Sequence, residues 1–160
     1  KLKKYLKLEY IRYALLALLL IFIIILCQGD RISNADIATV TENVLAAVGS
    51  DGMNQGNHQM IRRLYGLDPN DYEGISLYYP DTNMGAKEFL IVKMTSTDQY
   101  NTVESAMNSR VETQKGIFEG YAPEQYAMVE NYELCHEGNY VVLVISEDPQ
   151  AAVNAFRKSL

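Results

Sequence analysis

Hydrophobic residues follow two different patterns along the chain, and the change between them comes near residue 30. Every position from Tyr13 to Cys27 is apolar or aromatic, which makes an uninterrupted run of 15 residues. After Gly29, apolar residues recur at helical or alternating spacing between turns rich in Gly, Pro, Asn and Asp. The sequence therefore predicts one apolar segment followed by a single folded domain of ordinary size.

The apolar run and its flanks predict a transmembrane signal anchor. A helix of 15 residues reaches roughly 22 Å, and extending it back to Leu8 covers about 30 Å if Arg12 snorkels to the head groups. Cations precede the run at Lys1, Lys3, Lys4, Lys7 and Arg12, whereas Arg31 is the one nearby cation after it. By the positive-inside rule, the N-terminus is cytoplasmic and the domain lies outside a cell membrane that the helix crosses once. The lipid bilayer is then the first expected partner.

Two other interpretations of the N-terminal segment remain open. A basic start followed by an apolar core is also typical of a cleaved signal peptide, with small residues suited to cleavage near 27–29 and 33–35. A third interpretation places a lipid on Cys27, although Leu26 stands where a lipoprotein signal has a small residue. All three place the domain outside the cytoplasm.

We divide the chain into three parts. Residues 1–28 form a cytoplasmic basic stub and the anchor, residues 29–33 a tether, and residues 34–160 an extracytoplasmic domain. Within the domain, helical periodicity predicts five helices. They cover 34–48 with Asn34 as cap, 55–65 ended by Gly66, 99–118 after Asp98, 124–130, and a last helix from Pro149 capped by Ser146 or Asp148.

Alternating, β-branched and aromatic residues predict two β-hairpins between the helices. The strands cover 75–79 and 88–94 in the first hairpin, and 131–136 and 140–146 in the second. A loop of about seven residues joins the first pair, and a tight turn containing Gly138 joins the second.

Two hairpins predict an α+β fold, in which a four-stranded antiparallel sheet carries helices on one face. The strand from Tyr140 is wholly apolar, so we expect it to be central and covered on both faces. Each hairpin runs into a helix, and the residues Asp98 and Asp148 before these helices are 50 positions apart. This spacing suggests a ββα repeat.

Charge excludes one class of partner. Residues 31–160 carry nine lysine and arginine residues against 18 aspartate and glutamate residues, a net charge of −9. A surface that binds nucleic acid needs the opposite sign, so we expect no nucleic-acid partner. The excess of carboxylates is typical of a domain kept soluble near an anionic membrane.

The domain shows no motif for catalysis, cofactor binding or metal binding. The two histidines, His58 and His136, are 78 residues apart and do not have the spacing of a metal cluster. Cys135 and His136 are neighbours in a predicted strand and point to opposite faces, which excludes them as nucleophile and base. We therefore expect no catalytic residue, no cofactor and no metal, and a buried structural role for Cys135.

Tyrosine is the one unusual residue count. The chain has 12 tyrosines and no tryptophan, and nine of the tyrosines follow the apolar run. Exposed tyrosines stack on sugar rings or anchor protein partners, which makes Tyr79, Tyr121, Tyr126 and Tyr132 candidate contact residues. The alternative is that these rings fill the core and its edges in a domain without tryptophan.

After the basic N-terminus and the apolar segment, the chain contains the stretches LYGLDPNDYEGISLYYPDTNMGAKEFLIVKM, VESAMNSRVETQKGIFEGYAPEQ and NYVVLVISEDPQAAVNAF. This order of segments resembles a family of small extracytoplasmic proteins of unknown function from Gram-positive anaerobic bacteria. The resemblance covers roughly residues 35–160. The resemblance implies a membrane-anchored or lipoprotein-like protein with an accessory role beside machinery that modifies cell-surface polysaccharide, and it implies no functional residues.

These features favour a non-catalytic accessory module that binds an envelope protein or a glycan through a patch bearing tyrosines. An envelope hydrolase or transferase is one alternative, and it needs two converging carboxylates from the group Asp68, Asp71, Glu119 and Glu124. A structural protein that assembles through an open sheet edge is the other alternative.

Overall fold

The computed structural model divides the chain into two compact units, Lys1–Arg31 and Ile32–Leu160, and each is described by itself. It describes secondary structure for residues 2–27 and 32–160, and side chains for residues 10–24 and 32–160. Most of the predicted tether therefore lies outside the described residues, as does the side chain of Cys27.

The first unit contains the helix α1 (Leu2–Cys27), and its described side chains, at positions 10–24, are all exposed. Across the residues that the structure describes, no helix is both long and apolar enough to cross a membrane.

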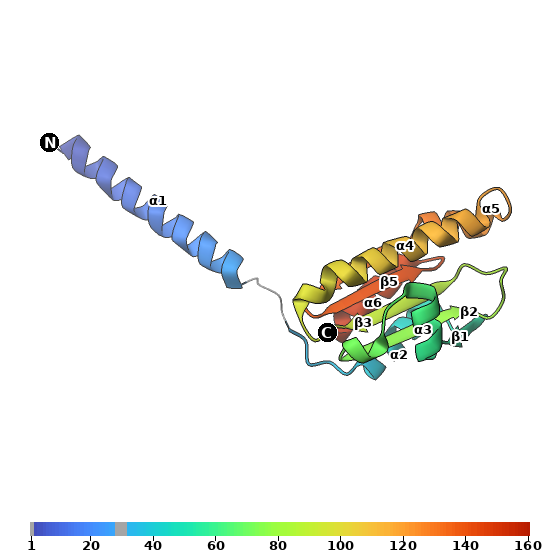
Figure 1. The fold of residues 1–160 in the computed structure, drawn as a ribbon. Helices are drawn as coiled ribbons and strands as arrows, with labels where there is room; N and C mark the ends of the chain where they lie inside the picture. The colour runs from blue at the N-terminus through green and yellow to red at the C-terminus, as the bar shows by residue number, and fades with distance from the viewer. Residues whose placement is uncertain (1, 28–31) are drawn as a thin grey trace. The chain divides into compact units, whose positions relative to one another are not determined.

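A five-stranded antiparallel sheet organises the second unit (Figure 1). Its strands are β1 (Met53–Gln55), β2 (Gly74–Pro80), β3 (Glu88–Lys93), β4 (Glu133–Glu137) and β5 (Tyr140–Ile145), in the order β1-β2-β3-β5-β4. The α+β class and both hairpins are confirmed, but the prediction of four strands is wrong. The extra strand β1 has only three residues, too few for an alternating pattern, and it exists through its pairing with the end of β2.

Helices cover both faces of the sheet, as the wholly apolar strand from Tyr140 predicted, and not one face as the two hairpins by themselves suggested. α2 (Ile37–Val48) and α6 (Pro149–Ser159) pack on one face. The other face is covered by α3 (His58–Tyr65), α4 (Tyr100–Phe118) and α5 (Pro123–Glu130). Two short 3₁₀ turns lie in the connections: η1 (Pro69–Asp71) between α3 and β2, and η2 (Thr97–Gln99) between β3 and α4. All six residues of β3 and of β5 are buried, so neither strand has a solvent face. The central, doubly covered position predicted for β5 is confirmed.

Local chemistry sets several helix ends as predicted and one differently. The backbone N–H of Ala151 donates to Asp148 at 3.0 Å, which identifies Asp148 as the cap of α6. Gly66 ends α3 with a φ of 67°, a left-handed conformation that favours glycine. The prediction that Asn34 caps the first helix of the domain is wrong, because α2 begins at Ile37 with Asp36 at the N-cap.

The predicted repeat is present in element order but not in packing. β2-β3-α4 and β4-β5-α6 follow the same order, and β3 pairs with β5 in antiparallel fashion. A two-fold axis that exchanges two antiparallel neighbours runs perpendicular to the sheet, so it would keep both helices on one face. α4 and α6 lie on opposite faces, so the two halves are not related by this symmetry.

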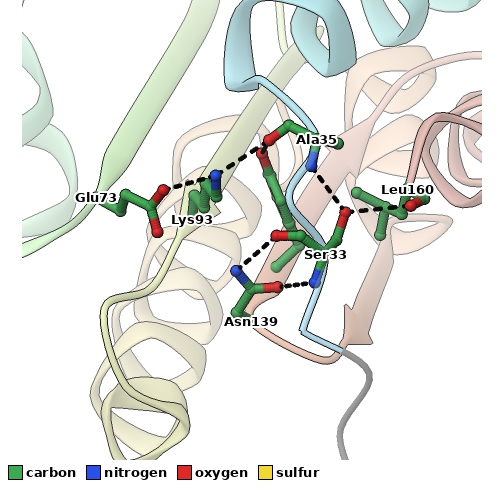
Figure 2. A network of polar contacts seen from close by, with 7 residues as sticks. Ser33, Ala35, Glu73, Lys93, Asn139 and Leu160 are labelled. Atoms are coloured by element: carbon green, nitrogen blue, oxygen red, sulfur yellow. Dashed lines mark hydrogen bonds and ion pairs between the residues drawn. The ribbon is translucent and has the colours of Figure 1, made fainter.

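The segment before α2 is fixed to distant parts of the domain by hydrogen bonds (Figure 2). The side-chain amide of Asn139 donates to the backbone oxygen of Ser33 at 3.1 Å and accepts from its N–H at 2.8 Å. The Ser33 hydroxyl donates to the carbonyl of Leu160 and accepts from the N–H of Ala35, both at 3.1 Å. These contacts bring the start of the domain, the β4–β5 turn and the C-terminal residue together.

Lys93, the last residue of β3, extends the same network. Its ammonium donates to the carbonyl of Ala35 at 3.1 Å and pairs with Glu73 at 2.6 Å (Figure 2). The hydroxyl of Tyr140 donates to the same carbonyl at 2.6 Å. The carbonyl of Ala35 therefore accepts two hydrogen bonds from residues of the sheet, which fix the segment before α2 to the domain.

Candidate binding cleft

A cleft of about 480 Å³ opens between α3, the end of β2, the β2–β3 loop (residues 81–87) and α4. Its apolar lining consists of Met60, Leu64, Tyr79, Pro80, Ile117 and Phe118. Its polar side chains are Asn54, Arg63, Asp81, Thr82, Asn83, Arg110 and Gln114. The volume is within the range of sites for small ligands, and the lining is divided about equally between apolar and polar side chains.

Exposed apolar side chains gather around this cleft. Of the large hydrophobic side chains in residues 32–160, four are exposed: Ile32, Met84, Ile117 and Tyr121. Ile117 lines the cleft, and Met84 belongs to the loop that borders it. The hydroxyl of Tyr121 lies 3.3 Å from the sulfur of Met84. Ile117 therefore lies in the cleft, and Met84 and Tyr121 form a contacting pair at the loop that borders it. Exposed apolar side chains that lie near one another favour an interaction site.

The β2–β3 loop that borders the cleft is attached to the rest of the domain. The N–H of Ala86 donates to the side-chain oxygen of Gln125 on α5 at 2.8 Å. The ammonium of Lys87 donates to the carbonyl of Asp51 at 3.3 Å. The loop is therefore attached both to α5 and to the residues just before β1, and these contacts give the cleft a defined wall.

A buried carboxylate lies beneath the cleft. Glu88 begins β3, and its side chain is fully buried on the α4 face, because it is two residues before Leu90 on that face. Arg110 donates to the two Glu88 oxygens, from Nε at 2.9 Å and from Nη2 at 2.7 Å. Gln114 donates to Glu88 at 3.3 Å, and the Tyr65 hydroxyl donates to it as well.

Regular secondary structure places these partners. Arg110 and Gln114 are four residues apart on α4 and so share one face of that helix. Tyr65 is the last residue of α3, and its ring lies 6.0 Å from the Arg110 guanidinium carbon. Each Glu88 oxygen thus accepts two hydrogen bonds, which compensates for the burial of its charge.

Burial and charge shift the titration of these groups. Burial, and next the Glu88 carboxylate, raise the pKa of the Tyr65 hydroxyl well above its ordinary value. Burial by itself lowers the pKa of the Arg110 guanidinium, but the hydrogen bonds and charge of Glu88 outweigh burial and raise it. Arg110 therefore keeps its positive charge and Tyr65 its proton throughout the physiological range.

A sequence profile of the domain of unknown function DUF4358 matches residues 46–146, more than half of the chain. The chain belongs to the DUF4358 family. The match contains every strand of the sheet and every residue that lines the cleft. Comparisons with curated proteins and with solved structures give no significant match.

The four candidate tyrosines of this DUF4358 domain differ in their surroundings. Tyr79 lines the cleft, and Tyr121 is exposed. Tyr126 and Tyr132 are half-buried against the core, as Tyr79 is. Tyr79 is thus the one of the four that lines the cleft, and Tyr121 reaches the bordering loop through its contact with Met84.

The four candidate carboxylates do not line the cleft of the DUF4358 domain. Asp68 pairs with Arg62 at 2.7 Å, and this hydrogen bond lowers the pKa of the Asp68 carboxyl. Asp71, Glu119 and Glu124 are exposed. Among the described residues, no group of three or more His, Cys, Asp or Glu side chains is placed to hold a metal ion.

The buried position predicted for Cys135 is confirmed, and its burial raises the pKa of the thiol.

Sequence reasoning missed Glu88, Arg110 and Tyr65. A signal for the first two was present: Glu88 is the first residue of a strand that continues with apolar residues, and Arg110 lies three residues after Met107 on the inward side of α4. Charged residues within buried stripes need partners, so each of these positions indicated the other. Tyr65 looked like an ordinary apolar residue at the end of a helix.

Proposed function

We propose that the DUF4358 domain is a non-catalytic, extracytoplasmic binding module, and that its cleft receives the sugar end of an envelope glycan. One observation carries this proposal: of the four exposed large hydrophobic side chains in residues 32–160, Ile117 lines the cleft, and Met84 lies in the loop that borders it, in contact with Tyr121. Tyr79 offers a ring face for a sugar, and amide and hydroxyl side chains such as Asn54 and Thr82 offer hydrogen bonds to its hydroxyl groups.

The size of the site favours a sugar over a protein surface. A stable protein interface buries about 800 Å² on each partner, with an apolar centre. Three exposed apolar side chains around a hollow of about 480 Å³ are too few for such a centre, but they suit one or two sugar rings.

Assembly through the sheet edges has less support. Charged residues and very short strands are the usual protection of a sheet edge. The edge strand β4 begins and ends with glutamate, at Glu133 and Glu137, and the other edge strand, β1, has three residues.

We also propose that the N-terminal segment attaches the domain to the cell membrane as a single-pass anchor, with the N-terminus in the cytoplasm. The apolar run from Tyr13 to Cys27 and the cations before it support this location. The exposure of the apolar side chains at 10–24 supports it too, because a stretch of this kind is stable only against lipid or a partner. Membrane fractionation with carbonate washing tests it, since an anchored protein stays in the pellet.

A glycan array probed with the whole chain in detergent micelles tests the binding proposal. The test variant is Ile117→Ala at the cleft, and the matched control is Ile32→Ala, an exposed isoleucine beside Ser33 at the opposite end of the sheet. We expect envelope-type glycans to bind the wild type and the control, and to bind Ile117→Ala several-fold more weakly. Equal loss in both variants, or no bound glycan at all, would contradict the proposal.

A further inference from the structure

We infer that the ligand of the cleft carries an anionic group, a carboxylate or a phosphate, that binds the guanidinium of Arg110. This inference rests on the proposed function, because it takes the cleft as the binding site. It adds the chemical class of the ligand and the residue that recognises it.

The position of Arg110 supports a recognition role. Its side chain is nine-tenths buried and still lines the cleft. The two bonds to Glu88 use Nε and Nη2, two of the five N–H groups that an arginine offers. The guanidinium therefore keeps donors for a further acceptor, and it can act only as a donor.

Glu88 makes this donor rigid. Two parallel hydrogen bonds hold one edge of the planar guanidinium against a carboxylate that has no exposure, and Tyr65 lies over the same group. A rigid, charged donor loses little conformational entropy when it binds. The end that Glu88 leaves free, Nη1 with the second hydrogen of Nη2, can make another pair of bonds, and carboxylates and phosphates are the acceptors that pair with arginine in this way.

The other charges around the cleft agree with an anionic group. Arg63 is a second arginine on the lining, and the ion pairs of the described residues do not include it. Of the residues that line the described cleft, Asp81 is the one carboxylate. In a domain with twice as many acidic as basic residues, a lining with two arginines and one aspartate is less acidic than the domain as a whole, although Glu88 beneath it offsets the charge of Arg110.

The test titrates three sugars that differ only at C6: glucose, glucuronate and glucose 6-phosphate. The protein is the whole chain, labelled with ¹⁵N in detergent micelles, and NMR follows the backbone signals of the cleft and the Nε–H signal of Arg110. We expect at least one anionic sugar to bind about tenfold more tightly than glucose, because hydrogen bonds between charged groups are the stronger ones. The preference between the two distinguishes a carboxylate source from a phosphate source.

Each outcome separates the two proposals. If glucose binds in the cleft as tightly as the charged sugars, anion recognition is overturned and the sugar-binding cleft stands. If the charged sugars shift only signals outside the cleft, anion recognition is overturned as well. If none of the three shifts a cleft signal, the proposed function itself is overturned.

A pair of neighbouring arginines provides matched variants. Arg63→Gln removes a charge from the lining and should weaken the binding of anionic sugars several-fold more than it weakens the binding of glucose. Arg62→Gln is the control, because Arg62 pairs with Asp68 and does not line the cleft. Equal effects of the two variants would show attraction by net charge alone and would contradict a defined site.

Arg110 itself is tested with the conservative change Arg110→Lys, because removing its charge would leave Glu88 buried without a partner. Lysine keeps the charge but presents no planar fork. We expect a folded protein by its NMR spectrum and a preference for anionic sugars that falls about tenfold. An unchanged preference would overturn the role of Arg110.

Discussion

Strand β3 has a charged residue at each end, and the surroundings of these two residues differ. Glu88 is fully buried, and the side chain of its partner Arg110 is 10 % exposed. The side chain of Lys93 is 10 % exposed, but that of its partner Glu73 is 54 % exposed. Because 88 and 93 differ by an odd number, the two side chains lie on opposite faces of the sheet.

The comparison indicates that the two ion pairs of β3 have different roles, because one lies wholly in the interior and the other has a half-exposed partner. At the Glu88 end, every contact is with a side chain from α3 or α4, and the pair lies beneath a cleft. At the Lys93 end, the contacts fix the backbone of the segment that enters the domain. We therefore interpret the first network as part of the binding site and the second as a fixing point for the chain.

The largest effect is expected for Arg110→Ala. It leaves the Glu88 charge buried and unpaired, so the free energy of unfolding should fall by about 3–5 kcal/mol in urea denaturation. Arg62→Ala, which breaks an exposed pair, is the control and should cost less than about 1 kcal/mol. The double variant Glu88→Leu with Arg110→Leu should regain much of the loss, and a loss below about 1 kcal/mol in Arg110→Ala would contradict our view of this end.

The next effect is expected for Asn139→Ala at the other end. It removes two hydrogen bonds to the buried backbone of Ser33, which should cost about 2 kcal/mol. Asn43→Ala, at an exposed site that bonds Ser159, should change stability by less than about 0.5 kcal/mol. Similar values for the two variants would mean that the start of the domain is not fixed by this contact.

A smaller effect at neutral pH is expected for Tyr65→Phe, about 1 kcal/mol for the lost hydrogen bond to Glu88. Because the folded-state pKa of Tyr65 is raised, its stabilisation is complete below about pH 10 and is lost as the pH rises through the folded-state pKa. Stability of the variant should therefore fall less steeply than that of the wild type above about pH 10, as thermal unfolding at several pH values measures.

The Lys93 end offers the counterpart Tyr140→Phe. Burial first, then Glu73 and Asp36, raise the pKa of Tyr140 to about 12. The variant should show the same flattening between about pH 10 and pH 12. Tyr121→Phe, at an exposed site, is the control, and a slope as flat in this control would contradict both predictions.

The smallest effect is expected for Glu73→Gln. Half-exposed ion pairs contribute about 0–1 kcal/mol, and Lys93 keeps its bond to the carbonyl of Ala35. The difference from wild type should disappear in 1 M NaCl, because salt screens exposed pairs. A loss comparable to that of Arg110→Ala would remove the distinction between the two ends of β3.

Much of the fold could be predicted because its signals are local. The strand from Tyr140 has no polar position, which predicted its central place in the sheet. Gly66 ends one helix through its left-handed conformation, and Asp148 begins another through its hydrogen bond to the backbone. β1 escaped prediction because three residues carry no periodicity. The apolar strand predicted that both of its faces are covered, but a strand pattern does not show which helix covers each face.

The sequence by itself determined the apolar N-terminal segment, the α+β class, both hairpins and the absence of a known catalytic motif, since each depends on residues close together in the chain. Only the tertiary structure decided the site. Glu88, Arg110 and Tyr65 come from a strand and two helices, and their hydrogen bonds exist only after these elements pack. The gathering of Met84, Ile117 and Tyr121 depends likewise on which surfaces packing leaves exposed, and no periodicity in one segment records it.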